Sequence, residues 1–483
     1  MTGFSMKNVH RAMRVPTLLV IVFFVPQILL AGCTAARVQG RPPLDAQGAL
    51  YLYLQPLPAA AARLAFTLES VAVVTEGGEE IPLSLRIDEL SPRSVSRERL
   101  LATGELPPGR YAALAFKVRK ASLTREEDNA ALQSPEESVR VDIPFAVARK
   151  KARVLTLTFR YAESLTGGVL FNPRFTILPA AKVVKGLLGF VVNRGSNTVT
   201  VFDKVTGRVS DVIPTGAAPE GMVIDPSGWP RAYVAVSGED VVEVIDLLQS
   251  EVIDRIRLTM GDRPLEVALT PDGKTLLTVN AGSNTVSFID TVSRYEQARI
   301  PLPNGPRSIL LDATGRRAYV FNTLGSSVSV IDVPNRGVAA TITTESAPLR
   351  GQLNRRGDRL YVIHQWSPNL LVIDTSSLAV VRKQNVGLGF QALKVDPASD
   401  WIYMARRGGS DVQVLDPFTL MARRFLGAEG EVVFMTIDGQ ENSLLLLMPG
   451  KETLRIVDLI RYDPRAEIDV GEDPCWATVL GER

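Results

Sequence analysis

The chain has 483 residues, and its 54 basic and 52 acidic side chains nearly cancel. Residues 1–32 contain three of the basic residues and no acidic residue, so the remainder carries 51 basic and 52 acidic residues. A protein so close to neutrality lacks the electrostatic footprint of a nucleic-acid-binding protein, and we expect no nucleic acid partner. Its two cysteines, Cys33 and Cys475, are too few for a disulfide framework, so apolar cores must stabilise the fold.

Residues 1–32 are predicted to form a signal peptide rather than a part of the fold. Basic residues at positions 7, 11 and 14 precede an apolar run over residues 15–30. The run ends in Leu30-Ala31-Gly32-Cys33, which resembles the lipobox of bacterial lipoproteins. That resemblance implies that Cys33 becomes the lipid-modified first residue of the mature protein. It also implies a lipid anchor in the outer membrane, facing the periplasm or the cell surface, because Thr34 is not the aspartate of inner-membrane retention. The alternative is a single membrane span that is kept as an anchor.

A separate region lies between the leader and the second half of the chain. Residues 33–47 are expected to form a polar tether with a reach of about 20 Å. Residues 48–182 contain alternating apolar runs, such as 50–54, 113–118 and 139–143, which predict a β-sandwich. The motif Leu106-Pro107-Pro108-Gly109-Arg110-Tyr111 resembles the turn that enters a strand in transthyretin-like and carbohydrate-binding-like sandwich domains.

Residues 187–483 contain a repeat with a period of about 42 residues. An aspartate closes an apolar, strand-like run in each period, at Asp203, Asp246, Asp290, Asp332, Asp374, Asp416 and Asp458. A second landmark keeps the same spacing, at Pro219, Pro264, Pro306, Pro348, Phe390, Val432 and Pro474. A period of this length with four short strands is typical of a propeller blade, so the sequence predicts an all-β protein in which a seven-bladed β-propeller follows the sandwich.

The second strand of each repeat ends in a similar short sequence motif. Residues 190–193 read Phe-Val-Val-Asn and residues 319–322 read Tyr-Val-Phe-Asn, each followed by a polar turn. These repeats resemble the YVTN-type propellers, and the resemblance implies the fold but not a function. The repeat begins on a second strand at Gly189 and ends on an innermost strand at 476–480, so we expect the tail to complete the first blade.

The sequence offers little catalytic chemistry. His364 is the only histidine after residue 32, which argues against multi-histidine metal centres. The sequence also lacks a haem-attachment motif, a Gly-x-Ser-x-Gly elbow and a phosphate-binding Gly-Lys loop. We therefore expect no catalytic residues, no metal and no cofactor, and we interpret the seven aspartates as turn-capping residues. Cys475 and Trp476, in the closing strand, are expected to lie in the core.

Departures from the repeat gather on one predicted face of the propeller. Turns between second and third strands share that face with the loops that enter the innermost strands. These positions give a set of ligand-binding candidates: His364, Trp366, Phe390, Arg406, Arg407, Arg350, Arg307 and Glu266. Aromatic and arginine side chains beside a propeller opening suit a glycan or an anionic small ligand. The alternative is loop variation without function, in which Trp366 simply packs over a blade edge.

The sequence thus favours a lipid-anchored envelope protein that binds or scaffolds rather than catalyses. Its partner is expected to be a protein, a peptidoglycan or other polysaccharide strand, or a small ligand. Two alternatives stay open, namely a lactonase-type or hydrolase-type propeller with a metal at the tunnel mouth, and a propeller that handles haem through His364. The former would use carboxylates such as Glu266 and Glu220.

The anchor leads to a first prediction. The variant Cys33→Ser should be released from the membrane or mislocalised, because the attached lipid would supply most of the membrane affinity. Membrane fractionation of cells that express the parent and the variant measures this. Unchanged fractionation of the variant, with the leader still removed, would contradict the lipoprotein interpretation.

Overall fold

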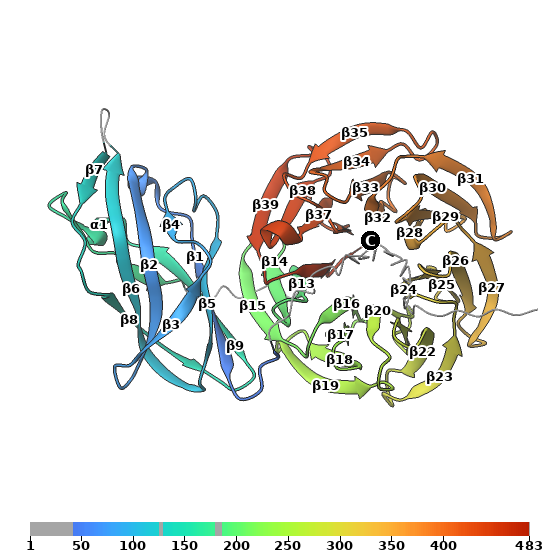
Figure 1. Ribbon diagram of the computed structural model, residues 1–483, viewed down its shortest axis with the longest axis horizontal. Helices are drawn as coiled ribbons and strands as arrows, with labels where there is room; N and C mark the ends of the chain where they lie inside the picture. Colours follow the sequence, from blue (N-terminus) through green and yellow to red (C-terminus); the bar gives the residue numbers. More distant parts are fainter. Residues whose placement is uncertain (1–41, 125–128, 179–185, 483) are drawn as a thin grey trace, which may run out of the picture. The chain divides into compact units, whose positions relative to one another are not determined.

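The computed structural model describes residues 42–124, 129–178 and 186–482. The predicted leader, Cys33 and most of the tether lie outside these residues. The all-β class and the seven-bladed propeller are confirmed (Figure 1). Across the described residues, no helix has both the length and the apolar character needed to cross a membrane.

The N-terminal region is one curled, mixed sheet of ten strands in the order β12-β9-β1-β5-β3-β2-β6-β7, with β4 beside β2 and β8 beside β6. Its elements are β1 (Gly48–Leu54), η1 (Ala59–Ala61), β2 (Leu64–Thr75), β3 (Glu80–Leu85), β4 (Glu89–Leu90), β5 (Arg99–Leu106), β6 (Gly109–Thr124), β7 (Asn129–Leu132), β8 (Val139–Val147), β9 (Ala152–Phe159), α1 (Tyr161–Ser164), the hairpin β10 (Leu165–Thr166) and β11 (Leu170–Phe171), and β12 (Phe175–Ile177).

The two layers expected of a sandwich are joined into this single sheet by β3. That strand pairs with β2 through residues 80–83 and with β5 through residues 84–85, so hydrogen bonding continues from one layer to the other. The strand β8 shows why the sequence alternates, because its odd positions from Val139 to Val147 are buried and its even positions are exposed. The curled sheet encloses its own apolar core.

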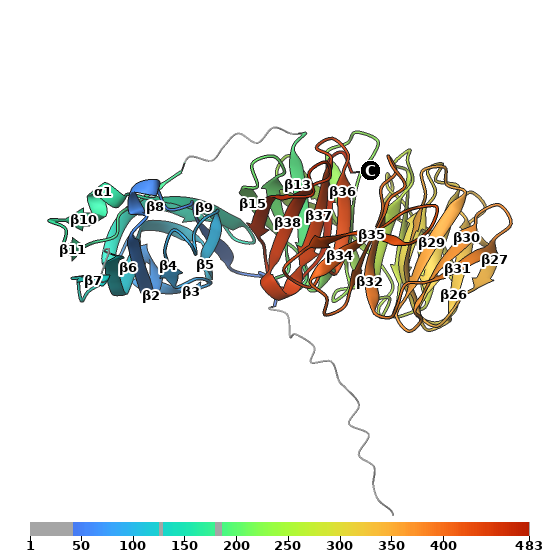
Figure 2. The ribbon, with the colours of Figure 1, turned by 90° about the horizontal axis from the view of Figure 1, so that it is seen from above.

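The propeller consists of seven four-stranded antiparallel blades around a central channel (Figures 1 and 2). Blade one consists of β13 (Leu188–Asn193), β14 (Thr198–Asp203), β15 (Val209–Pro214) and β40 (Pro474–Val479), and blade two consists of β16 (Pro219–Ile224), β17 (Arg231–Val236), β18 (Val241–Asp246) and β19 (Glu251–Arg257). Blade three consists of β20 (Pro264–Leu269), β21 (Thr275–Asn280), β22 (Thr285–Asp290) and β23 (Glu296–Pro301), blade four of β24 (Pro306–Leu311), β25 (Arg317–Asn322), β26 (Ser327–Asp332) and β27 (Gly337–Thr343), and blade five of β28 (Pro348–Leu353), β29 (Arg359–His364), β30 (Asn369–Asp374) and β31 (Ala379–Asn385). Blade six consists of β32 (Phe390–Val395), β33 (Ile402–Arg406), β34 (Asp411–Leu415) and β35 (Ala422–Gly427), and blade seven consists of β36 (Phe434–Asp438), β37 (Ser443–Met448), η2 (Pro449–Lys451), β38 (Thr453–Asp458) and β39 (Pro464–Asp469).

The repeated aspartates cap the turns that follow the third strands, as predicted. In six of the seven turns, an aspartate Oδ1 accepts hydrogen bonds from the backbone N–H groups two and three residues later, as Asp203 does from Val205 and Thr206. In the other turn, Asp332 accepts from the N–H of Asn335. These bonds lower the pKa of several of the carboxyls, including Asp416 and Asp458, because they favour the charged form. The aspartates therefore build turns and do not form a carboxylate ring.

The tail closes the ring, also as predicted. The last strand, β40, lies antiparallel to β13, with Gly189 opposite Val479 and Val191 opposite Ala477. A buried ammonium group reinforces this seam between blades one and seven. Lys204 Nζ lies 3.0 Å from Asp438 Oδ1, 2.9 Å from Gln440 Oε1 and 2.6 Å from the carbonyl oxygen of Leu480. All three ammonium protons thus have an acceptor.

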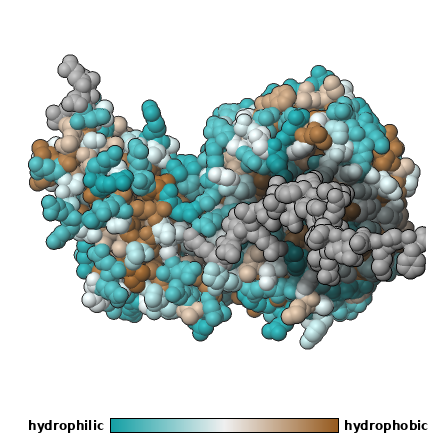
Figure 3. All heavy atoms as spheres, in the orientation of Figure 1, coloured by the Kyte–Doolittle hydropathy of each residue, from teal (hydrophilic) through white to brown (hydrophobic). Residues whose placement is uncertain are grey.

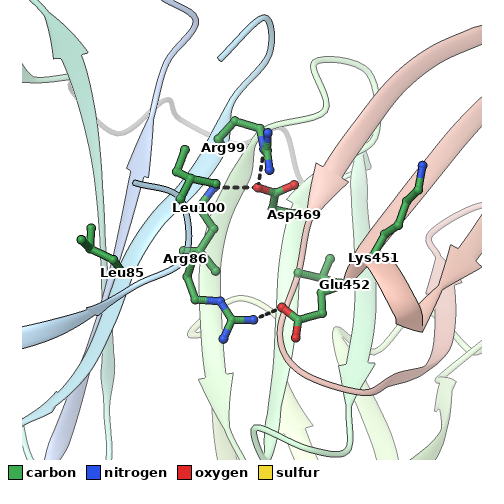
Figure 4. A pocket seen from close by; sticks show the side chains of 9 residues that line it. Leu85, Arg86, Arg99, Leu100, Lys451, Glu452 and Asp469 are labelled. Atoms are coloured by element: carbon green, nitrogen blue, oxygen red, sulfur yellow. Dashed lines mark hydrogen bonds and ion pairs between the residues drawn. The ribbon is translucent and has the colours of Figure 1, made fainter. Parts of the chain in front are cut away.

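The curled sheet and the propeller belong to one compact unit, which covers residues 39–483. Tyr51, Tyr53 and Leu100 share an apolar cluster with blades one and seven. Around it, Arg99 Nε lies 2.8 Å from Asp469 Oδ2, which also accepts the N–H of Leu100 at 2.9 Å, and Arg86 pairs with Glu452 (Figure 4). A cavity of about 310 Å³ lies among these residues. In Figure 3, hydrophobic residues gather over the curled sheet and in smaller spots at the rim of the propeller, among hydrophilic residues.

The seam leads to a second prediction. Replacing the buried ammonium in Lys204→Met leaves the Asp438 carboxylate buried without a cation, so the free energy of unfolding should fall by about 3–5 kcal/mol. Urea unfolding followed by circular dichroism measures the change. The matched control is Lys274→Met, an exposed lysine in a turn of blade three, which should shift stability by less than about 0.5 kcal/mol. Equal stability of Lys204→Met and the parent would show that the seam does not depend on this ion pair.

Candidate functional site

The central channel opens into a cavity of about 480 Å³ on the predicted face of the propeller. Two sets of equivalent positions line it. One set directly follows the second strands and includes Arg194, Gln365 and Arg407, whereas the other directly follows the repeat landmarks and includes Glu220 and Arg307. The sequence-based prediction that these turns and loops share one face is confirmed. We call this cavity, which twenty residues line, the arginine mouth.

Two of the arginines at the arginine mouth are held by carboxylates. Arg194 Nε lies 2.7 Å from Asp473 Oδ2, and its Nη1 lies 3.3 Å from Glu220 Oε2. Burial disfavours the charged form of Arg194. The hydrogen bond that Arg194 donates to Asp473 and the nearby Glu220 carboxylate outweigh this effect and raise the pKa of the guanidinium. Arg350 Nη2 lies 3.4 Å from Glu266 Oε2.

Two other arginines at the arginine mouth are not neutralised in this way. Within the described parts of the chain, neither Arg307 nor Arg407 has a carboxylate within ion-pair distance of its guanidinium. Arg307 is open to water but surrounded by protein. Burial and the like charge of Arg350 lower its pKa, although Glu220 and Glu266 oppose the shift. The positive charge of Arg307 is therefore only partly compensated, and an added anion would stabilise it.

Burial also affects two carboxylates at the arginine mouth, Glu220 and Glu266. Burial raises the pKa of Glu220, although Arg194 opposes the shift. Burial likewise raises the pKa of Glu266, although Arg350 opposes it. Neither glutamate is a free, fully solvated carboxylate, since each is engaged by an arginine.

An aromatic constriction forms the inner wall of the arginine mouth. The Phe434 and Trp476 rings lie 4.3 Å apart between centroids, and the Arg350 guanidinium lies 5.0 Å from each centroid. These three residues and Glu266 also line a second cavity of about 590 Å³ further along the channel. The arginine mouth and the second cavity therefore meet at one cluster of four residues. We call this cluster the constriction.

Four of the eight residues predicted to bind ligand do line the channel, namely Arg307, Arg350, Arg407 and Glu266. The other four do not line it. Trp366 has 69% of its surface exposed, but it lies outside both channel cavities. Phe390 is buried in the core between blades five and six. Arg406 covers it, with its guanidinium carbon 4.6 Å from the ring centroid and its Nη2 donating to the Val386 carbonyl at 2.6 Å. This pair packs the blade instead of presenting free groups to a ligand.

His364 is a packing residue, and the repeat explains why it is there. In three other blades the equivalent asparagine donates to two hydroxyls, five and seven residues later, as Asn280 does to Thr285 at 3.0 Å and Ser287 at 2.7 Å. Blade five has Asn369 and Leu371 at those positions, so the pair of hydroxyls is missing. His364 fills the site instead, only 1% exposed, with Nδ1 3.3 Å from the Asn369 carbonyl oxygen. Burial lowers its pKa to about 4.

Several lining residues were missed by reasoning from the sequence. Arg194 and Gln365 directly follow second strands, and Gln391 and Asp473 lie beside landmarks, so listing these positions in every blade could have found them. Trp476 was expected in the core, and that expectation was wrong in part, because its ring forms the constriction as well as packing on Phe434. Cys475 also lines the arginine mouth, and it is a free thiol, as expected.

No metal-binding arrangement is evident where the structure describes the chain, because no group of three or more His, Cys, Asp and Glu residues is positioned to hold an ion. The candidate ligands for a metal at the arginine mouth, Glu220 and Glu266, are each paired with an arginine. What the site offers chemically is cationic hydrogen-bond donors beside aromatic rings.

Comparisons with known proteins support the fold. The family model described as "Lactonase, 7-bladed beta-propeller" matches residues 259–417, about a third of the chain, which span blades three to five and part of blade six. No curated protein matches the chain. The propeller is therefore similar to that family over these blades.

Solved structures give the same picture. A functionally unknown protein from Desulfotomaculum acetoxidans is 14% identical with a TM-score of 0.52, over 60% of this chain and 98% of its own. The dihydro-heme d1 dehydrogenase NirN, in complex with DHE, is 15% identical with a TM-score of 0.50, over 63% of this chain and 77% of its own. The Kuenenia stuttgartiensis hydrazine synthase is 20% identical over 57% of this chain and 94% of its own, with a TM-score of 0.49. At such identities the likeness shows the fold alone.

The buried histidine leads to a third prediction. Its pKa is about 6.5 in the unfolded chain and about 4 in the fold, so the unfolded state binds the extra proton between these values. Stability should therefore fall as the pH drops below about 6.5, by about 3 kcal/mol when pH 4 is reached. In His364→Asn this part of the acid sensitivity should disappear, as measured by the difference in melting temperature between pH 7.5 and pH 4.5. The same difference in the parent and the variant would mean that other groups cause the acid sensitivity.

Proposed function

We propose that the propeller binds a small anionic ligand, through its carboxylate or phosphate groups, at the arginine mouth. The observation that carries the proposal is Arg307, whose guanidinium sits among protein walls without a carboxylate partner in the described chain and beside the like charge of Arg350. A second unpaired guanidinium, that of Arg407, reaches the same cavity from blade six.

The type of side chain supports an anion. Arginine presents planar N–H donors that match the two oxygens of a carboxylate or the oxygens of a phosphate. Four arginines and four carboxylates line the cavity, so its formal charge is balanced, and Glu220 and Glu266 act on Arg307 from a distance without an ion pair to it. The Gln365 side chain also lines the cavity, whereas the Gln391 amide already donates to Glu431 Oε1 at 2.8 Å and to the Val432 carbonyl at 3.1 Å.

The size of the site favours a small molecule. A cavity of about 480 Å³ falls within the range of small-ligand pockets. A cavity of this volume is too small for a protein surface, whereas the acidic end of a peptidoglycan or polysaccharide strand would also fit the chemistry. We therefore place a protein partner, if there is one, elsewhere on the molecule.

The proposal includes a location in the cell envelope. The lipobox-like ending at Cys33 supports a lipid anchor on the outer membrane, facing the periplasm or the cell surface. The tether would then keep the propeller close to the membrane, within about 20 Å. The ligand-binding role and the anchor are separate parts of the proposal, and each has its own test.

The two alternatives find less support at the arginine mouth. Similarity to the lactonase family favours a hydrolase, but Glu220 and Glu266 are each engaged by an arginine and do not fit a metal centre. Likeness to a dihydro-heme d1 dehydrogenase suggests haem, but His364 lies in a blade core and does not line the channel. We derive no reaction step through either group.

The proposal leads to a fourth prediction. Citrate and inorganic phosphate should bind the parent, and Arg307→Gln should weaken their binding by roughly 10- to 100-fold, because a hydrogen bond to a charged group is worth about 1.5–3 kcal/mol. Isothermal titration calorimetry at low salt measures the affinities. The matched control is Arg316→Gln, an exposed arginine at the other end of β24, which should bind as the parent does.

Two results would contradict the proposal. One is the absence of anion binding to the parent at millimolar concentration. The other is equal affinity of the parent and Arg307→Gln, which would move the site away from the arginine mouth.

A further inference from the structure

The second cavity differs in character from the arginine mouth. Its wall includes the half-buried apolar side chains of Ile224, Leu311 and Leu480. The charge of Lys394, which also lines it, is already paired with Glu482 at 3.2 Å. This cavity of about 590 Å³ therefore combines apolar surface with polar groups, among them Asp225 and Glu482, whereas the arginine mouth offers cationic donors.

The constriction borders both of these cavities. The rings of Phe434 and Trp476 and the guanidinium of Arg350 line both cavities. The aromatic rings place apolar surface beside the arginine mouth, and Arg350 places a cation beside the second cavity. A molecule that passes the constriction would have a polar end on one side and an apolar end on the other.

We infer, on the basis of the proposed function, that the channel binds an anionic amphiphile. Its carboxylate or phosphate lies against Arg307 and Arg407, and its apolar part passes the constriction and lies against Ile224, Leu311 and Leu480. The hydrophobic effect then contributes affinity in proportion to the apolar area that the second cavity covers.

The start of the described chain lies on the same side as the arginine mouth. Pro42 and Leu44 line a small recess together with residues 196–198, which form the turn of blade one next to Arg194. Eight residues lie between Cys33 and Pro42 in the sequence. If Cys33 carries the lipid, an amphiphile that leaves the membrane surface meets the arginines first.

The inference can be tested with a homologous series of ligands. Hexanoate, octanoate and decanoate, each below its micellar concentration, are titrated into the purified full chain by calorimetry. Each pair of added methylenes should tighten binding by roughly tenfold while the second cavity has room. Decyltrimethylammonium, with the same tail and the opposite charge, should bind at least tenfold more weakly than decanoate.

A matched pair of variants locates the tail. Leu311→Asn should flatten the dependence on chain length and leave the affinity for citrate unchanged, because citrate has no tail. Leu324→Asn, at an 80% exposed leucine of the same blade, should behave as the parent does. If Leu311→Asn fails to fold, the series on the parent alone still decides.

The outcomes separate the inference from the proposed function. If citrate binds in an Arg307-dependent manner but the affinity does not change from hexanoate to decanoate, the amphiphile is wrong and the anion site stands. If decyltrimethylammonium binds as tightly as decanoate, the tail binds without help from the arginines and the inference is also wrong. If no anion binds at all, both fail together.

Discussion

The pairing of β40 with β13 is the contact on which the rest of the propeller depends. It makes a closed ring from a linear repeat and removes the two open strand edges that the repeat would otherwise expose. It also builds the channel, because Asp473 and Trp476 from the end of the chain come to lie beside Arg194 and Glu220 from its first blades. The arginine mouth therefore exists only when the ring is closed.

The seam between blades one and seven and the arginine mouth differ in how completely a positive charge is paired. At the seam, Lys204 is fully satisfied by three oxygen acceptors and by the charge of Asp438, so it can stabilise one register of closure but has nothing left for a ligand. At the arginine mouth, Arg307 has no comparable set of oxygen acceptors among the described residues, and the like charge of Arg350 opposes its charged form. This contrast, rather than the number of charged residues, marks the arginine mouth as a place where binding would release electrostatic free energy.

The sequence predicted the propeller well because its determinants are local and repeated. The aspartate turns, the landmarks and the second strands recur with one period, and the structure keeps all three. The curled sheet was less predictable, because its continuity depends on β3 pairing with both β2 and β5, a contact between segments that no repeat marks. Of the predicted site residues, Arg307, Arg350, Arg407 and Glu266 lie beside the channel, whereas His364, Phe390 and Arg406 are engaged by packing and hydrogen bonds within the blades.

That difference shows where function can be sought in such a repeat. A residue inside a strand must satisfy its blade, so its departures from the pattern are answered by packing partners. The seven residues that directly follow the landmarks face the channel instead, and they read Glu220, Leu265, Arg307, Leu349, Gln391, Val433 and Cys475. Polar and apolar types alternate around most of this ring, and the unpaired Arg307 stands between two leucines. A ring that places one partly compensated cation between apolar neighbours is suited to a ligand that is itself part charged and part apolar.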